Sequence, residues 1–357
     1  MTRPRQTVLI MTDTQRTDML GCYGNRDMQT PNLDRLASEG IRFDRAYTCQ
    51  PVCGPARSAL FTGTYPHTNG SWGNNMPIGQ NIPSVGQRLQ NQDIRTAYIG
   101  KWHLDATDYF GAGTCPEGWD PDSWYDMRNY LEELPEAERQ RSRDPEMAAE
   151  NEVKHEFTFA HRCSNRAIEF IKTHRHEDFF LVVSYDEPHH PWLCPPPYNT
   201  MYNDYAWNPG PNLHDALEDK PEHQRIWANG MQERSKENVE VCNSLFLGCN
   251  SFVDSEIGRV LAAIDTGIPE ALVIYTADHG DALGSHALTS KGPAMYDEIT
   301  RIPFIVRWPG TAPAKTSSAQ PVSHIDIVPS ILDAFDIASP PILEGNSLLP
   351  LFENPAA

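Results

Sequence analysis

Positive charge is scarce in this sequence. Its 29 lysines and arginines stand against 48 aspartates and glutamates, which gives a formal net charge of −19 over 357 residues. Nucleic acids and anionic membrane surfaces both require a basic footprint on the protein. The composition therefore argues against both as main partners. A small anionic substrate remains compatible with it if a local pocket of positive charge overcomes the overall field.

Long hydrophobic runs and a leader sequence are also lacking. The opening residues lead into a short apolar segment that ends near Met11, without a signal-peptide cleavage site. No apolar run approaches the roughly 20 residues of a membrane-spanning helix. The 8 cysteines are scattered and form no metal-type CxxC pair, which favours reduced thiols over a disulfide framework. We therefore expect a cytoplasmic protein without a membrane partner.

The sequence does contain an alternation of strand-like and helix-like segments, the pattern of a mainly parallel α/β sheet covered on both faces. The expected strands are 7–11, 95–100, 179–184, 271–276 and 302–307, and the expected helices are 30–40, 84–90, 151–174, 239–264 and 325–335. Residues 116–150, rich in acidic residues, Trp and Tyr, are interpreted as an insertion rather than core. Residues 188–229 form a long loop, which is uncommon in a compact protein and usually functional.

One stretch, residues 49–63, carries a reactive side chain at the start of an expected helix. Cys53 is followed by Gly54 and Pro55, and Arg57 lies one turn further on. Proline suits the first turn of a helix, so the helix should begin near Cys53. Free N–H groups and the helix dipole at such an N-terminus favour a bound anion. Arg57 would point at the same place.

Other polar residues follow the expected strands. Asp13 follows the first strand, Lys101 and His103 the second, His189 and His190 the third, and Asp278 and His279 the fourth. Ligands of open α/β sheets bind beyond the carboxyl ends of the strands, so these side chains should share one rim. Taken alone, each histidine would be a hydrogen-bonded loop residue, Asp278 a turn cap and Lys291 a solvated lysine. Their common location favours a site.

Five segments together form a highly specific pattern. They are Cys53-Gly-Pro-Ala-Arg57, Gly100-Lys-Trp-His103, Pro188-His-His-Pro191, Asp278-His-Gly-Asp281, and Lys291 ahead of Tyr296-Asp-Glu-Ile-Thr-Arg-Ile-Pro303. With them the chain resembles, nearly end to end, the type I sulfatases of the alkaline phosphatase superfamily. It is especially similar to an uncharacterised bacterial subgroup of that family. The resemblance implies a large mixed, mainly parallel sheet sandwiched by helices.

The resemblance also implies a domain division. Family members usually continue beyond a segment like Gly345–Leu351 into a smaller C-terminal subdomain with an antiparallel sheet, whereas this chain ends at Ala357. We therefore expect a catalytic domain at 1–345 and, at 346–357, only the start of a subdomain that is largely missing.

The family's chemistry implies that Cys53 is converted to formylglycine, whose hydrated aldehyde is the nucleophile, by a formylglycine-generating enzyme. Asp13, Asp278 and His279 would hold a divalent cation that also contacts the residue at position 53. Oxygen-rich ligands favour Ca²⁺. The imidazole of His279 leaves Mn²⁺ or Zn²⁺ open.

The resemblance assigns the remaining roles to the basic side chains of the rim. Arg57 and Lys101 would anchor the hydrated aldehyde and the developing charge. His103 would take a proton from the second geminal hydroxyl, so that sulfate is expelled and the aldehyde re-forms. His189 and Lys291 would hold the transferred sulfate and protonate the leaving oxygen.

Two positions depart from the common family pattern. Thr14 replaces the second of two paired aspartates, which makes the metal site less anionic, and Ala56 replaces the serine after the motif proline. Phosphonate monoester and phosphodiester hydrolases share the formylglycine and tolerate loss of the second aspartate, so they remain an alternative. A second alternative is an anion-binding protein in which Cys53 stays a thiol.

The substrate is a small anionic ester, for which a carbohydrate sulfate or an aryl sulfate is our prediction. Polar and aromatic residues near the rim are candidate pocket walls, and these are Asn74, Asn75, His190 and Trp192. An indole such as that of Trp192 suits stacking on a sugar ring. The sequence leaves open whether the protein forms a homo-oligomer.

Overall fold

An eight-stranded sheet forms the centre of the protein, with strand order β3-β4-β1-β5-β7-β2-β6 and β8 paired to β2. The computed structural model describes residues 5–357 except 145, 150–152, 206–211, 213–214 and 233–238. The strands are β1 Gln6–Thr12, β2 Ile41–Tyr47, β3 Arg95–Gly100, β4 Phe179–Ser184, β5 Leu272–Ala277, β6 Arg301–Ile302, β7 Phe304–Arg307 and β8 Thr316–Ser323. β3, β4, β1 and β5 are parallel, whereas β7 is antiparallel to β5 and to β2. The expected mixed, mainly parallel α/β sheet is therefore confirmed.

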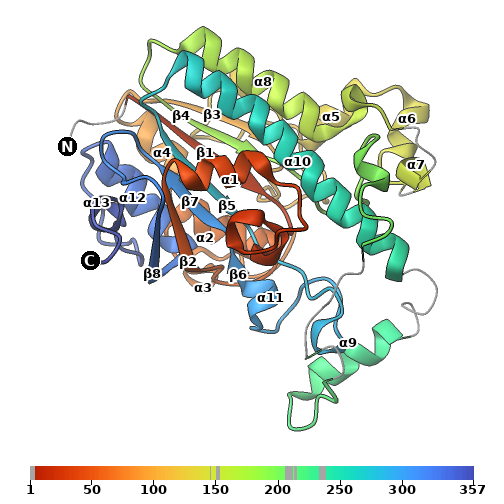
Figure 1. Ribbon diagram of the computed structural model, residues 1–357. Helices are drawn as coiled ribbons and strands as arrows, with labels where there is room; N and C mark the ends of the chain where they lie inside the picture. Colours follow the sequence, from red (N-terminus) through yellow and green to blue (C-terminus); the bar gives the residue numbers. More distant parts are fainter. Residues whose placement is uncertain (1–4, 145, 150–152, 206–211, 213–214, 233–238) are drawn as a thin grey trace.

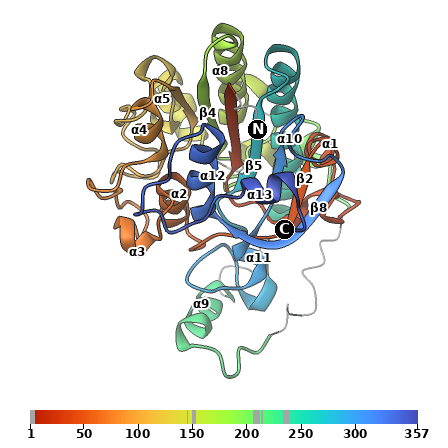
Figure 2. The ribbon, with the colours of Figure 1, turned by 90° about the vertical axis from the view of Figure 1, so that its left-hand side faces the viewer.

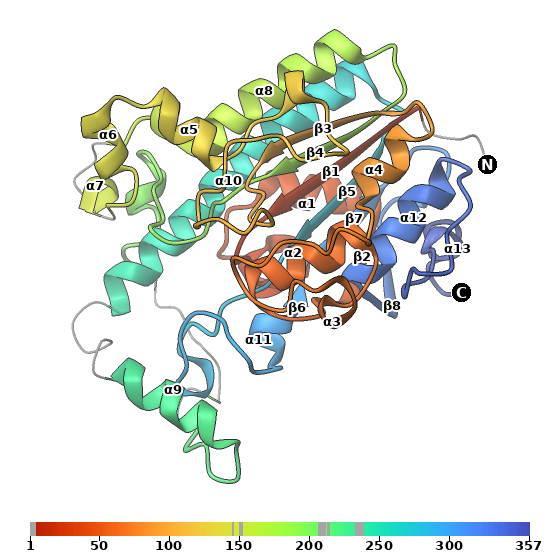
Figure 3. The same cartoon turned by 180° about the vertical axis from the view of Figure 1, so that it is seen from behind.

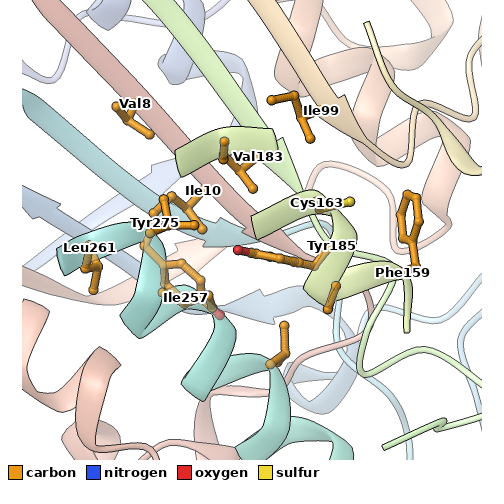
Figure 4. Close-up of a cluster of buried hydrophobic side chains, with 14 of the residues drawn as sticks. Val8, Ile10, Ile99, Phe159, Cys163, Val183, Tyr185, Ile257, Leu261 and Tyr275 are labelled. Atoms are coloured by element: carbon orange, nitrogen blue, oxygen red, sulfur yellow. The ribbon is translucent and has the colours of Figure 1, made fainter. Parts of the chain in front are cut away.

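Alternating side chains of the central strands feed two separate hydrophobic cores. On β1, Val8 and Ile10 belong to one core, and Leu9 and Met11 belong to the other. Figure 4 shows Val8 and Ile10 beside Val183 of β4, all facing helices that cover this side of the sheet. Because both faces are buried, these strands are continuous apolar runs, as is usual for parallel sheets.

Helices cover both faces of the sheet. They are α1 Pro31–Ser38, α2 Cys53–Thr62, α3 Pro66–Asn69, α4 Val85–Gln90, α5 Met127–Glu133, α6 Glu136–Arg141, α7 Glu146–Ala149, α8 Phe159–His174, α9 Glu222–Gln232, α10 Val239–Gly267, α11 Asp297–Thr300, α12 Ile327–Ala334 and α13 Leu349–Glu353. Figures 1 and 3, from opposite sides, show α1, α8 and α10 on one face and α2, α4 and α12 on the other. Figure 2 shows α9 and α11 below the sheet.

The sequence predicted the four parallel strands β3, β4, β1 and β5 well and the other strands poorly. Strands 95–100 and 179–184 have the expected bounds, but β2 and β8 were missed and 302–307 is split at Pro303. Proline has no N–H for the ladder, so it interrupts the pairing there. The helix expected over 151–174 begins at Phe159, after a short 3₁₀ turn at His155–Phe157. Residues 151 and 152 lie outside the described part of the chain.

The interpretation of 116–150 as an insertion outside the core was wrong for its large side chains. Trp119, Tyr125 and Tyr130 are each less than 5% exposed and belong to the two cores. Tyr125 also forms a bridge with Ile99 of β3, which extends the sheet by one contact. The burial of these three side chains indicates that they pack rather than bind a ligand.

The last residues of the chain lie against the same sheet. Leu348, Leu349 and Phe352 are buried in the core that also contains Phe43 of β2, and the rings of Phe43 and Phe352 meet edge-on. The domain boundary at 345 stays a prediction. In the described part of the chain, no helix is long and apolar enough to cross a membrane. The cytoplasmic location stays a prediction as well.

Candidate active site

Three buried side chains meet where β1 and β5 end. Asp13 follows β1, while Asp278 and His279 follow β5, and all three are 0% exposed. The backbone N–H of Asp278 donates to the carbonyl of Thr12, at 3.2 Å, which keeps the two strand ends in register. The expected rim at the carboxyl ends of the strands therefore exists.

Cys53 joins this group from the first residue of α2. The preceding Val52 is extended and the helix ends at Gly63 in the left-handed region, so the apolar run between them forms one buried helix. The Cys53 Sγ lies 3.2 Å from Nε2 of His279 and 3.9 Å from Oδ1 of Asp13. The position of Cys53 at a helix N-terminus, expected from Pro55, is confirmed.

Arg57 forms ion pairs with both aspartates. Its Nη2 donates to Asp13 and its Nε to Asp278, each at 3.1 Å. Its Nη1 donates to the carbonyl of Lys101 at 2.7 Å and to Oγ of Ser184 at 2.8 Å. Because the guanidinium is fully buried, it both neutralises the carboxylates and fixes their orientation.

Lys101 enters through a tight turn after β3. Gly100 has φ +128° and a Cβ there would lie 1.9 Å from the carbonyl oxygen of Ser184, so only glycine fits. The Lys101 N–H donates to that same carbonyl at 2.8 Å. Its Nζ lies 2.7 Å from Asp13 and 2.9 Å from Asp186. The lysine is therefore a buried cation between two carboxylates.

His103 and the two asparagines make hydrogen bonds near the start of α2. Nε2 of His103 is 3.3 Å from Oδ1 of Asn75, and Oδ1 of Asn74 accepts from the N–H of Gly54 at 2.8 Å. His103 and Asn75 both have φ near +60°. Such strained backbone is held only where the surroundings enforce it, and it clusters at functional sites.

His189 and Lys291 approach the same cluster from separate loops. Nδ1 of His189 lies 2.9 Å from the hydroxyl of Tyr109, and Cys53 is close enough to raise the pKa of its imidazole. Nζ of the half-buried Lys291 lies 3.5 Å from Oγ1 of Thr14. Arg57, Lys101, His189 and Lys291 are therefore all close to Cys53, and His103 joins them through the ring of Tyr109.

Two candidate pocket walls are less central. His190 is exposed and its ring lies 4.8 Å from that of Trp192. The ring of Trp192 also packs 6.0 Å from Phe246, at a tilt of 33°. Part of the indole is therefore used for packing, and its role as a sugar platform stays a prediction.

The electrostatics of the site are those of an anion receptor. Burial alone would raise the pKa of Asp13, but Lys101, His189, Lys291 and His279 hold it well below its usual value. The pKa of the Cys53 thiol is also lowered, because Lys291, Lys101 and His279 outweigh burial and Asp13. A negative charge at position 53 is thus stabilised inside a protein that is acidic overall.

The second aspartate responds in the opposite way. Burial, followed by the charge of Asp13, raises the pKa of Asp278 to about 7. Burial would lower the pKa of His279, but Asp278 and Cys53 raise it to about 9. A divalent cation bound beside Asp278 would counteract this rise, because it would favour the ionised carboxylate.

The donor set fits a divalent metal. One ligand atom each of Asp13, Cys53, Asp278 and His279 lies within 4.8 Å of the others, and all four residues are buried. Carboxylate oxygens with one imidazole accommodate Ca²⁺, Mn²⁺ or Zn²⁺. The Cys53 sulfur occupies the place that an oxygen of hydrated formylglycine would take.

A second group of metal-type residues, His155, His161 and Glu256, joins α8 to α10. Its buried carboxylate already has a cation, because Arg259 lies 2.5 Å from Oε2 of Glu256. The same guanidinium lies 3.1 Å from Nδ1 of His161, so that this nitrogen already has a hydrogen-bond partner. We therefore interpret this group as an ion-pair network between helices.

The sequence missed several residues of the site, namely Tyr109, Arg143, Ser184 and Asp186. Ser184 and Asp186 come at the end of β4 and just after it, so the rule that selected His189 could have selected them. Tyr109 and Arg143 come from loops and carried no signal in the sequence.

Glu187 is a buried carboxyl group with no ion-pair partner among the residues that the structure describes. Its Oε1 accepts from the N–H of Ala160 at 2.9 Å, and its Oε2 has no hydrogen-bond partner among the described residues. Burial, and then the charge of Asp186, raises the pKa of Glu187 from 4.5 to about 8. Stability should therefore fall as the pH rises from 4.5 to 8, because only the unfolded chain loses this proton readily.

Glu187→Gln is expected to raise the stability at pH 8.5 by an amount on the order of a few kcal/mol and to change it little at pH 4.5. The amide keeps the acceptor for Ala160 and cannot ionise. Thermal unfolding at both pH values measures the difference, with Glu169→Gln, a surface change on α8, as control. An equal shift at both pH values would contradict the assignment.

The fold and the site together define a large mixed α/β protein with a buried cluster of side chains suited to a divalent metal. Comparisons with known proteins identify its family as one of hydrolases. The sequence profile described as Sulfatase matches residues 5–337. The chain is 46% identical over 360 residues to "Uncharacterized sulfatase YidJ" of Escherichia coli, covering 99% of this chain and 72% of that protein. The chain therefore belongs to the sulfatase family and is a sulfatase, a hydrolase of sulfate esters.

More distant relatives extend the comparison. An "N-acetylglucosamine-6-O-sulfatase" of Bacteroides thetaiotaomicron is 25% identical over 423 residues, which cover 99% of this chain and 72% of that protein. A solved phosphonate monoester hydrolase from Silicibacter pomeroyi has a TM-score of 0.79 at 23% identity, covering 99% of this chain and 77% of that one. The latter likeness confirms the alkaline phosphatase-like fold alone.

Proposed function

We propose that this sulfatase cleaves a sulfate monoester of a carbohydrate or an aryl alcohol, with formylglycine made from Cys53 as its nucleophile. The observation that carries the proposal is the position of Cys53. Its sulfur lies at the N-terminus of α2, against His279 and Asp13, in a site where cations lower its pKa. An anionic oxygen of the hydrated aldehyde would be stabilised there in the same way.

A divalent cation held by Asp13, Asp278, His279 and residue 53 would lower the pKa of the nucleophilic oxygen and polarise the sulfate. The fold orients the two carboxylate ligands before any metal binds. Arg57 donates to one oxygen of Asp278 and to one oxygen of Asp13, each at 3.1 Å. The orientation of both aspartates is therefore set by the fold.

The basic side chains hold and neutralise the sulfate. Lys101 and Lys291 both lie close enough to Cys53 to affect its pKa. They can bind the oxygens of the transferred group, which gain charge in the transition state. His189 protonates the leaving oxygen, and His103 takes the proton of the second geminal hydroxyl, so that sulfate leaves without water attacking sulfur.

The proposal of a carbohydrate substrate is supported by the names of two relatives and by exposed polar side chains near the site. Two relatives are named for sulfated carbohydrates, N-acetylglucosamine-6-O-sulfate and ulvan. Asn74, Asn75 and His190 are exposed at the rim, where they can bond to sugar hydroxyls. Ca²⁺ is our choice of metal and a formylglycine-generating enzyme is the required partner.

Matched esters of one phenol test the transferred group. We expect kcat/KM for the aryl sulfate to exceed that for the aryl phosphonate by at least about 10-fold. A panel of sulfated sugars then tests the natural class. Faster turnover of the phosphonate would overturn the sulfate assignment, and activity on aryl esters alone would overturn the carbohydrate part.

A phosphonate monoesterase is the second candidate. Thr14 replaces the second aspartate of the family pattern, and its Oγ1 donates to Asp13 at 2.6 Å instead of adding a charge. A phosphonate monoester and a sulfate monoester each carry one negative charge at neutral pH, so this less anionic metal site accommodates either. The matched esters above decide between the two.

A further inference from the structure

Tyr109 lies at the meeting point of three side chains with proposed catalytic roles. Its hydroxyl is 3.0 Å from Nζ of Lys101 and 2.9 Å from Nδ1 of His189. The ring of His103 meets its ring edge-on, with centroids 5.6 Å apart. No other described residue outside the expected set contacts all three of these side chains.

The direction of the hydrogen bonds around Tyr109 follows from Asp186. The Tyr109 hydroxyl makes a very short hydrogen bond to Oδ1 of Asp186. Lys101, His189 and Arg143 outweigh burial and lower the pKa of Asp186 to about 2, so this carboxylate only accepts. The phenol proton therefore points to Asp186. The lone pairs of the phenol oxygen are left for Lys101 and His189.

This order fixes the tautomer of His189. A phenol oxygen that donates to Asp186 can only accept from the imidazole, so Nδ1 of His189 carries a proton. The carbonyl of His190, at 2.8 Å from the same Nδ1, also requires a donor there. Nε2 is then the ring nitrogen available to the reacting ester.

We propose that Tyr109, held by Asp186 and Arg143, is a positioning residue that keeps His189 oriented as an Nε2 acid and keeps Lys101 directed at the sulfate. The inference rests on the proposed function for its catalytic part. The acid form of His189 is the imidazolium, which carries a proton on each ring nitrogen. Burial, Lys291 and Lys101 lower the pKa of this imidazole, and the negative charge of the bound ester offsets their effect. When the S–O bond breaks, the bonding pair stays on the leaving oxygen and takes the Nε2 proton. The imidazole is left neutral, and its remaining proton on Nδ1 is hydrogen-bonded to Tyr109.

Arg143 braces the far end of this arrangement. Its Nη1 lies 3.3 Å from Oδ2 of Asp186, and its Nη2 donates to the carbonyl of His190 at 2.5 Å. Its guanidinium also lies 4.6 Å from the centre of the Tyr109 ring, and Lys101 lies 4.1 Å from it. The aromatic ring is thus held by two cations, which fixes the direction of its hydroxyl.

Tyr109→Phe tests the proposal because it removes only the hydroxyl. We expect kcat on aryl sulfates of poorly acidic phenols to fall by about 10²-fold, since these need the acid most. Sulfates of strongly acidic phenols should lose less than about 3-fold, so the leaving-group dependence becomes steeper. Inorganic sulfate, measured by calorimetry, should bind about 5-fold more weakly because Lys101 and His189 are less well held.

Tyr202→Phe is the matched control. It also removes a buried hydroxyl, one that accepts from the N–H of Gln29 at 2.7 Å and contacts Ser251 at 2.6 Å, away from the site. It should keep the leaving-group dependence and sulfate affinity of the wild type.

The possible results distinguish the positioning role of Tyr109 from the proposed sulfatase mechanism. A Tyr109→Phe enzyme that parallels Tyr202→Phe across the phenols, with wild-type sulfate affinity, would overturn the positioning role while leaving sulfate hydrolysis intact. If the wild type turned over no sulfate ester, the proposed function would fail. The role of Tyr109 would then be judged on sulfate affinity alone, where equal binding by variant and wild type overturns it.

Discussion

Cys53→Ala is expected to lower kcat/KM for an aryl sulfate by at least about 10⁴-fold, the scale seen when a nucleophile is removed. Alanine cannot be converted to formylglycine, so the variant has no nucleophilic oxygen. The side chain is 1% exposed and the change removes one atom from a buried helix start, so the fold should survive. Steady-state kinetics and thermal unfolding measure the two effects.

Cys49→Ala is the control for this experiment. Cys49 lies four residues earlier and its Sγ contacts Oγ of Ser323, 3.2 Å away, rather than the cluster. It should keep the activity of the wild type. Substantial turnover by Cys53→Ala would contradict a nucleophile at this position.

Asp13→Asn is expected to remove most of the bound metal and to lower kcat by at least about 10³-fold, because the change affects the metal and the basic residues together. Asp13 is the carboxylate shared by Lys101 and Arg57, at 2.7 and 3.1 Å. Breaking a buried pair of this kind also costs about 3–5 kcal/mol of stability. Elemental analysis of the purified proteins measures the metal, and kinetics measure the activity.

Asp18→Asn serves as control, since Asp18 is an exposed partner of Arg16 on the next turn of chain. It should keep both the metal and the rate. Wild-type metal content and rate in Asp13→Asn would show that the cluster is not the metal site. Rates restored to chelated wild type by Ca²⁺, but by neither Mn²⁺ nor Zn²⁺, would support our choice of metal.

The central strands could be predicted because their sequences are unambiguous. β4 is a run of apolar residues buried on both faces, and such runs end where polar loop residues begin. β8 contains serines, a glutamine and Pro321, so its sequence resembles a loop. Its pairing with β2 is a tertiary effect that no local pattern contains.

The site could be predicted as far as it follows the strands. Asp13, Lys101 and Asp278 come directly after strand ends, and His189 follows five residues after the end of β4. The parallel arrangement brings those strand ends together. Tyr109 could not be predicted in this way. It lies in a loop, and its proposed role depends on hydrogen bonds and ring contacts with Asp186 and Arg143, which are far from it in sequence. The aromatic residues of 116–150 were wrongly assigned to an insertion for a similar reason. Their neighbours in sequence are acidic, so the local pattern did not indicate that these side chains are buried.

The mass of the peptide that contains Cys53, from protein produced together with a formylglycine-generating enzyme and shown to be active, tests the central claim most directly. The account predicts a peptide lighter than the encoded one by the difference between a thiol and an aldehyde. The same peptide should react with a hydrazide probe, which also identifies the hydrated aldehyde, whose mass is almost that of the cysteine peptide. A fully active enzyme whose peptide has the mass of unmodified cysteine and does not react with the hydrazide would contradict the account.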